Sequence, residues 1–208
     1  MLMYCIRHGE STYNAQGRVQ GHLNIPLSEL GRRQAAALAE ICTGLAAEAI
    51  YCSPLRRARE TAEPIAAALT LPIREEPGLV EIKVGIFQGH SRDDLDRIYP
   101  DDYARWRTGD PDYVVPGGES RRALMHRGRE VLESIARGDY RKVIVVSHGA
   151  ILAAAFKSLL EIPAQRHPFM LENASLSRLE IDGSTVRLHT LNEVGHLKSV
   201  GLAGGGDL

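Results

Sequence analysis

The chain has 208 residues, 44% of them hydrophobic and 25% charged, and 25 Lys and Arg face 26 Asp and Glu for a formal net charge of -1 at pH 7. These values are typical of one globular domain with a substantial core. The balanced charge excludes a global field that would attract nucleic acid or an anionic membrane, so an anion site has to be built locally. No apolar stretch has the length of a bilayer span and no secretory signal is visible, so we expect a cytoplasmic protein with no membrane partner and no nucleic-acid partner.

The first element is an apolar run of strand-like composition over residues 1–6, which ends abruptly in Arg7-His8-Gly9-Glu10. In open α/β folds ligands bind at the carboxyl edge of the sheet, so this position favours a site. Arg7 offers a charged fork for phosphate oxygens, His8 a nitrogen that is nucleophilic when neutral, and Gly9 lets the backbone approach a bound group. A surface Arg and a structural His are the alternative interpretation.

Strands and helices alternate through the rest of the chain, separated by loops rich in Gly and Pro. Helices are predicted over residues 28–45, 54–69, 93–106 (interrupted at Pro100), 119–137 and 150–160. Strands are predicted over 48–52, 71–75 and 142–146, followed by a hairpin of 175–181 and 185–191. Residues 11–27 and 109–118 have the composition of loops, and 204–206 that of a frayed tail. The alternation indicates an α/β fold with a mainly parallel sheet, in a single domain over residues 1–208.

The three cysteines, Cys5, Cys42 and Cys52, lack the paired spacing of a zinc site. We interpret them as small core residues, with a redox role as the alternative. Cys5 and Cys52 each lie in an apolar run before a charged turn, which makes them candidate neighbours.

Polar side chains follow three of the predicted strands. Arg7-His8-Gly9 ends the first, Ser53 with nearby Arg57 the second, and Ser147-His148-Gly149 the run over 142–146. Carboxyl ends of parallel strands share one edge, so two imidazoles and two guanidinium groups are expected around a dianion. Histidine can carry a phosphoryl group covalently, and Glu81, in its own turn, is a candidate proton donor to a leaving oxygen.

The stretch Arg7-His8-Gly9-Glu10-Ser11-Thr12-Tyr13-Asn14 resembles the signature of the histidine phosphatase superfamily, which includes the cofactor-dependent phosphoglycerate mutases. Further blocks extend the resemblance over nearly the whole chain: Gln20-Gly21, Leu27-Ser28 with Gly31 and Gln34, Ser53-Pro54-Leu55-Arg56-Arg57-Ala58 with Thr61-Ala62, Glu81 with Gly85 and Gly89, Pro116-Gly117-Gly118-Glu119-Ser120, and Val146-Ser147-His148-Gly149. It implies a phosphoglycerate mutase-like fold, a three-layer α/β/α sandwich with a mainly parallel central sheet.

The resemblance also implies a covalent mechanism. In the family, the residue at the position of His8 attacks phosphorus and becomes phosphohistidine, while those at Arg7, Arg57 and His148 hold the transferring group. A neutral nucleophilic imidazole needs a hydrogen bond that fixes its tautomer. The sequence does not identify that partner of His8.

The same resemblance implies the rest of the pocket. Asn14 and the Gln20-Gly21 turn complete the phosphate site, and Glu81 protonates the leaving alcohol and then activates water. It implies no metal and no organic cofactor, in agreement with the lack of a His-Glu-x-x-His pattern.

The segment over residues 91–115 separates two related activities. The mutases carry a long insertion there and an adjacent pair of arginines for a substrate carboxylate, whereas this chain has Trp106-Arg107-Thr108. A shortened lid protects phosphohistidine from water poorly, so we expect a phosphatase that acts on a small phosphorylated metabolite. A 2,3-bisphosphoglycerate-dependent phosphoglycerate mutase is the alternative, and a non-catalytic module that binds a phosphorylated ligand is the alternative from another class.

Candidate substrate contacts are Arg105, Arg107 and Tyr113 in this segment and His22 outside it, each of which is otherwise a solvated loop residue. Phosphoserine, α-ribazole phosphate, a sugar phosphate and other phosphomonoesters stay open as substrates, and so does a homodimer. Other basic residues are interpreted without a ligand role: His90, His126, His167 and His189 as structural or exposed, and Arg121, Arg122, Arg127 and Arg129 as a solvated helix face.

Overall fold

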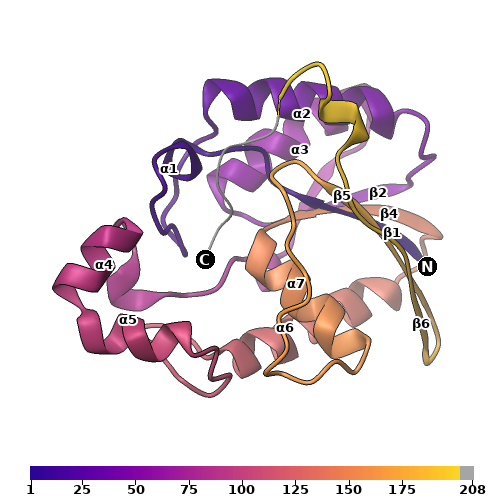
Figure 1. Ribbon diagram of the computed structural model, residues 1–208. Helices are drawn as coiled ribbons and strands as arrows, with labels where there is room; N and C mark the ends of the chain where they lie inside the picture. Colours follow the sequence, from indigo (N-terminus) through magenta and orange to yellow (C-terminus); the bar gives the residue numbers. More distant parts are fainter. Residues whose placement is uncertain (202–208) are drawn as a thin grey trace.

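The computed structural model describes residues 1–201, and a six-stranded sheet in the order β3-β2-β4-β1-β5-β6 lies at its centre (Figure 1). The strands are β1 (Leu2–Arg7), β2 (Ala49–Cys52), β3 (Ile73–Glu75), β4 (Lys142–Ser147), β5 (Leu176–Asp182) and β6 (Thr185–Glu193). The first four pair in parallel, and β5 and β6 add an antiparallel edge. The tail predicted at 204–206 lies outside the described residues.

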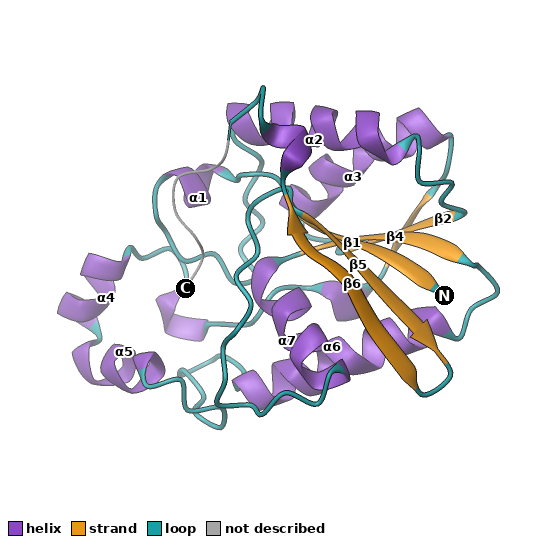
Figure 2. Ribbon diagram, turned by 45° about the vertical axis from the view of Figure 1, so that its right-hand side comes forward, coloured by secondary structure: helices purple, strands orange, loops and turns teal. Residues whose placement is uncertain are grey.

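Helices cover both faces of the sheet (Figure 2). One face packs against α2 (Glu29–Cys42) and α3 (Arg56–Leu69), and the other against α6 (Arg121–Ala136) and α7 (Gly149–Leu159). The shorter helices are α1 (Thr12–Ala15), α4 (Arg92–Ile98) and α5 (Pro100–Arg107), with 3₁₀ turns at Pro77–Leu79, Gly85–Phe87 and Gly195–Leu197. The expected three-layer α/β/α sandwich is confirmed. Within residues 1–201, no helix combines the length and the hydropathy of a membrane span.

Side chains of the central strands alternate between two cores. Val143 and Val145 of β4 pack toward α6 and α7, and the residues between and after them pack toward α2 and α3. A parallel strand covered on both faces is apolar throughout, which is why β4 is so clear in the sequence. Cys5 and Cys52 follow the same alternation and lie on opposite faces, so the prediction that they are neighbours is wrong.

One predicted segment differs from the structure, and in another a predicted interruption is confirmed. The expected loop over 11–27 contains α1, which begins with a capping box: the Ser11 hydroxyl accepts from the Asn14 amide, and the Asn14 side chain accepts from the Ser11 amide, each over 3.0 Å. One helical turn is too short for apolar periodicity to reveal it. The helix expected over 93–106 is two helices that meet at Tyr99, because Pro100 lacks an N–H and occupies the first turn of α5.

The turn after β1 crosses the first turn of α2 at two glycines. A Cβ on Gly9 would lie 2.7 Å from the Gly31 carbonyl oxygen, and a Cβ on Gly31 would lie 1.9 Å from the Glu10 carbonyl oxygen. Only glycine permits this approach of two backbones. The crossing therefore fixes the path of the residues that immediately follow His8.

We expect Gly31→Ala to lower the free energy of unfolding by about 1–3 kcal/mol, because its new methyl group collides with backbone rather than with a flexible side chain. Urea denaturation monitored by circular dichroism measures the loss. Gly44→Ala is the matched control, since the only atom near its Cβ would be the Ile41 carbonyl oxygen at 3.8 Å. Equal stability of the two variants would contradict the tight crossing.

Candidate active site

The carboxyl ends of β1, β4 and β2 lie side by side and carry the three polar turns. Arg7 at the end of β1 pairs with Ser147 of β4, and Cys52 at the end of β2 pairs with Val146. The turns that follow bring the rings of His8 and His148 together edge to face, with their centroids 5.1 Å apart. The two imidazoles thus meet at one edge of the sheet, as the strand order predicts.

One backbone hydrogen bond fixes the tautomer of His8. Its Nδ1 lies 2.7 Å from the carbonyl oxygen of Gly9, and because a carbonyl only accepts, Nδ1 carries the proton. Nε2 is then unprotonated, and Arg57 Nε donates to it over 3.2 Å. The partner that the sequence left open is therefore a main-chain carbonyl, which has no signal in the residue type.

His148 has one occupied ring nitrogen and one unoccupied. Its Nε2 lies 2.7 Å from the Ser53 hydroxyl, which accepts from the Leu55 amide and has no other acceptor for its own proton among the described residues, so we assign Ser53 as the donor to Nε2. Nδ1 then carries the ring proton, and it is buried with no hydrogen-bond partner among the described residues. An orphaned buried N–H costs free energy that a ligand oxygen would recover.

Both rings are held neutral by their surroundings. Burial lowers the pKa of His8 and of His148 well below the usual 6.5, and the charge of Arg57 lowers both further. In a neutral imidazole one ring nitrogen is unprotonated, so it has a lone pair that can attack phosphorus at pH 7. His8 is therefore poised as a nucleophile rather than as a charged anion ligand.

The two arginines are buried and anchored by carbonyl groups. Arg57 is 1% exposed, and its terminal nitrogens each donate over 2.9 Å, one to the Leu23 carbonyl and one to the Gly21 carbonyl. Gly21 has φ +51°, a conformation that favours glycine and aims this carbonyl at Arg57. Arg7, 2% exposed, donates to the Leu171 carbonyl. Both positive charges are thus fixed in place before an anion arrives.

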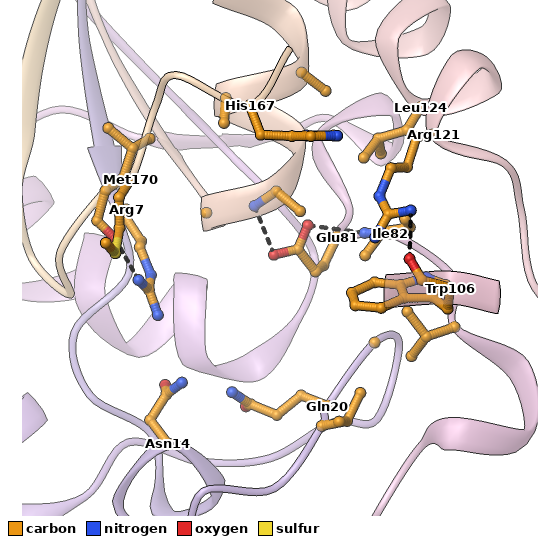
Figure 3. Close-up of a pocket in the computed structure, with 18 of the residues that line it drawn as sticks. Arg7, Asn14, Gln20, Glu81, Ile82, Trp106, Arg121, Leu124, His167 and Met170 are labelled. Carbon is orange, nitrogen blue, oxygen red and sulfur yellow. Dashed lines mark hydrogen bonds between the residues drawn. The ribbon is translucent and has the colours of Figure 1, made fainter. Parts of the chain in front are cut away.

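Asn14 and Gln20 close the site on the side of α1. The Asn14 side-chain oxygen accepts from Ser11 and from Asn173, and the Gln20 side-chain oxygen accepts from the Ser11 hydroxyl over 2.7 Å. With their oxygens engaged, both amides direct their NH₂ groups into the pocket, as Figure 3 shows. Donors of this kind suit phosphoryl oxygens.

Glu81 lies at the N-terminus of α7 and is 6% exposed. One carboxylate oxygen accepts from the Ala150 amide over 3.1 Å, and the other from the Ile151 amide over 3.0 Å and from the Ile82 amide over 2.8 Å. These bonds, two of them drawn in Figure 3, hold the carboxylate at the wall of the pocket, across from Arg7. It is placed to exchange a proton with a group bound between them.

Of the expected substrate contacts, some line the pocket in the structure and others do not. His22 Nε2 lies 2.6 Å from the main-chain oxygen of Glu81, and His22 does not line the pocket. Arg107 does line it, with one nitrogen 3.1 Å from Asp96 and its guanidinium over the Tyr103 ring at 4.8 Å. His22 therefore supports the Glu81 backbone, and Arg107 stays a predicted contact.

Arg105 and Tyr113, the other two expected contacts, lie against one another. The Arg105 guanidinium is 4.5 Å from the Tyr113 ring centroid, and the Tyr113 hydroxyl donates to Asp102. Neither side chain lines the pocket. They stabilise the lid from outside the cavity.

The prediction of a solvated face on α6 is wrong for two of its arginines. Arg121 lines the pocket, and Arg127 donates to the Gly78 and Val80 carbonyls over 2.8 and 2.7 Å, bracing the turn that leads to Glu81. Arg122 is exposed and paired with Asp112, as expected of a solvated residue. The spacing of residues along α6 did not reveal that Arg121 lines the pocket, because the lid that covers it belongs to a different element of the fold.

A cavity of about 920 Å³ is lined by Arg7, His8, Asn14, Gln20, Arg57 and Glu81 among others, whereas the fully buried His148 is not among its lining residues. The lid segment 91–115 supplies part of its wall through Arg92, Tyr103, Trp106 and Arg107. In the described part of the chain, no three His, Cys, Asp or Glu side chains form a cluster that would hold a metal ion.

The family model of the histidine phosphatase superfamily (branch 1) matches residues 3–194. This chain belongs to the histidine phosphatase superfamily. The resemblance seen in the sequence is confirmed, and several of its blocks contribute residues that line the cavity with His8.

Several relatives of this chain are named as phosphatases. A metal-independent phosphoserine phosphatase of Arabidopsis thaliana is 36% identical over 203 residues, which are 94% of this chain and 83% of the relative. A solved mycobacterial glucosyl-3-phosphoglycerate phosphatase in complex with VO3 is 32% identical with a TM-score of 0.85, over 93% of this chain and 99% of that one. The α-ribazole phosphatase from Shigella flexneri is 26% identical with a TM-score of 0.86, over 93% and 96%. The expected enzyme class, phosphoric monoester hydrolase, is confirmed for the family.

The buried imidazoles make the stability of this histidine phosphatase depend on pH. The unfolded chain binds protons near pH 6.5 and the folded chain only well below it, so the free energy of unfolding falls as pH falls from about 6.5. Each ring contributes up to about 1.4 kcal/mol per pH unit. We expect His148→Gln to flatten this dependence in urea unfolding between neutral and mildly acidic pH. The exposed His126→Gln is the control, and equal slopes for both variants would contradict the burial effect.

Proposed function

We propose that this chain hydrolyses a small phosphomonoester through a phosphohistidine on His8. The observation that carries the proposal is the His8 ring itself: Nδ1 is engaged by the Gly9 carbonyl, and the unprotonated Nε2 lies among Arg57, Arg7 and His148. A lone pair surrounded by fixed cations suits attack on a phosphoryl group.

In the first step, the Nε2 lone pair of His8 forms a bond to phosphorus while the bond from phosphorus to the ester oxygen breaks. The proton of Glu81 passes to the leaving oxygen, which departs as an alcohol. Arg7, Arg57 and the orphaned Nδ1–H of His148 stabilise the charge on the phosphoryl oxygens. The amide groups of the α1 side add two further donors.

In the second step, the Glu81 carboxylate accepts a proton from water, and the water oxygen attacks phosphorus. The bond from phosphorus to Nε2 breaks, inorganic phosphate leaves, and His8 regains its lone pair with its Nδ1 proton still held by Gly9. Glu81 ends protonated, as it began, so the cycle closes without a further reactant.

Hydrolysis is favoured over mutase activity by the lid. Two short helices, α4 and α5, stand where a mutase needs a longer cover, and the one candidate arginine there, Arg107, is paired with Asp96. Mutase activity stays the second candidate, because some relatives are named probable phosphoglycerate mutases. Phosphate release from a panel of monoesters, compared with bisphosphoglycerate-dependent turnover of phosphoglycerate, decides between them, and dominant mutase turnover would reverse the order.

The substrate is proposed to be a small phosphorylated metabolite in the cytoplasm. The relatives' names point to phosphoserine, glucosyl-3-phosphoglycerate and α-ribazole phosphate as the first compounds to assay. The homodimer stays a prediction.

We expect wild-type protein quenched during turnover to carry acid-labile phosphate on His8. His8→Ala lacks the nucleophile, so it should lose the label and about 10⁴-fold or more in kcat. Tryptic mapping of the labelled peptide measures the first effect and phosphate release the second, with exposed His126→Ala as control. Binding of phosphomonoesters without label or turnover in the wild type would instead support the non-catalytic module.

We expect Glu81→Gln to lower kcat/KM for an alkyl phosphate by about 10²- to 10⁴-fold, because its amide has no proton for the leaving oxygen. The loss should be smaller for p-nitrophenyl phosphate, whose leaving group departs without a proton. The exposed Glu130→Gln is the control. Equal losses on both substrates would show that Glu81 is not the proton donor.

A further inference from the structure

The cavity extends well beyond the phosphate end, along one face of α7. Ala150, Ala153, Ala154 and Lys157 all line it, at the i, i+3, i+4 and i+7 spacing of a single helical face. The alanines leave space for a ligand, and Lys157 closes the row. Lys157 lies seven residues beyond Ala150, whose amide binds Glu81, which is about 10 Å along the helix axis.

Lys157 is a buried cation without a counter-charge. It is 5% exposed, and its Nζ donates to the Ala164 carbonyl over 2.8 Å. Within residues 1–201 it forms no ion pair, and burial together with the nearby Arg121 charge lowers its pKa. Burying an ammonium group beside a neutral carbonyl is costly, and an anion in the cavity would offset that cost.

Arg121 lies at the same end of the cavity, on the facing helix. It is the first residue of α6, stacks on the Trp106 ring at 4.0 Å and donates to the Trp106 carbonyl over 3.0 Å. A cation in the first turn of a helix lies at the positive end of the helix dipole, which is unfavourable. Its neighbour Arg122 is compensated by an ion pair with Asp112, whereas Arg121 feels only the more distant charge of Asp110 and forms no ion pair within the described chain.

The loop before β5 adds His167 to this end of the cavity. Figure 3 shows His167 and Arg121 on one side of Glu81, with Arg7 on the other and Asn14 and Gln20 below. Between the two ends the wall is largely apolar, formed by Ile82, Leu124 and Trp106 among others. Among the described residues 1–201, seven Arg or Lys side chains line the cavity against two carboxylates, although the whole chain has a net charge of -1.

We propose that Arg121 and Lys157, with His167 beside them, form a second anion subsite, which binds a carboxylate or a second phosphate at the end of the substrate remote from the reacting phosphoryl group. The substrate class is then an elongated phosphomonoester with an apolar middle and a distal anion. A compound the size of phosphoserine would leave this end of the cavity empty. The proposal rests on the phosphomonoesterase activity proposed above.

The test uses three matched series of alkyl phosphates of increasing length. One series ends in a neutral hydroxyl, one in a carboxylate and one in a second phosphate. We expect kcat/KM of the wild type to favour an anionic end over the hydroxyl by about tenfold or more at one chain length, because a charge-assisted pair is gained only there. Comparison of the carboxylate with the phosphate series identifies which anion the subsite prefers.

Variants then locate the preference on the two cations. We expect Arg121→Leu and Lys157→Met each to reduce the ratio of kcat/KM, anionic over neutral, by about tenfold, and Arg121→Lys to restore part of it. Arg122→Leu is the matched control, since it removes the same charge from the same helical turn outside the cavity. The ratio is measured within each variant, so a partial loss of folded protein does not imitate the effect.

The outcomes separate this proposal from the proposed function. Wild-type protein that hydrolyses no member of any series overturns the phosphomonoesterase activity itself. Hydrolysis of the neutral series with no preference for an anionic end at any length overturns the second subsite and leaves the activity standing. A wild-type preference that survives in both Arg121→Leu and Lys157→Met also overturns it.

Discussion

The hydrogen bond between His8 Nδ1 and the Gly9 carbonyl is the constraint on which the site depends. It assigns the proton to Nδ1 and leaves Nε2 unprotonated, with Arg57 Nε donating to its lone pair. The carbonyl is in position because the backbone after β1 crosses α2 where Gly9 and Gly31 lack side chains. Burial of the ring then keeps it neutral. Packing between a strand end and a helix start thereby determines the chemistry of a nitrogen atom.

Backbone carbonyls hold several of the cations in the cavity. Arg57 is fixed by Gly21 and Leu23, and Lys157 by Ala164. A carbonyl dipole orients a cation without cancelling its charge. Carbonyl groups hold cations at both ends of the cavity. One group of cations faces the phosphoryl group beside His8, and a second lies about two helical turns away along α7.

The three-layer fold places the reacting groups and the groups that select the substrate on different elements. The carboxyl ends of β1, β2 and β4 carry the reacting groups, and each of these strands is buried at all but one residue. The far wall comes from α6, α7 and the lid helices. Aromatic side chains of the lid form a smaller core of their own around Phe87. Changes in the lid would therefore alter which substrate fits while the phosphate end stays intact.

The sequence by itself determined the strand ends and the residues on them, because an apolar run that stops at a charged turn is a local pattern. It located Arg7, His8 and His148 for that reason, and the family blocks added Asn14 and Gln20. It did not reveal the Gly9 carbonyl as the partner of His8, nor that Arg121 and Lys157 face one cavity. The residue type does not show where a main-chain carbonyl will lie. The two cations come together only through the packing of α6 against α7 and the lid, which are contacts between separate segments of the chain.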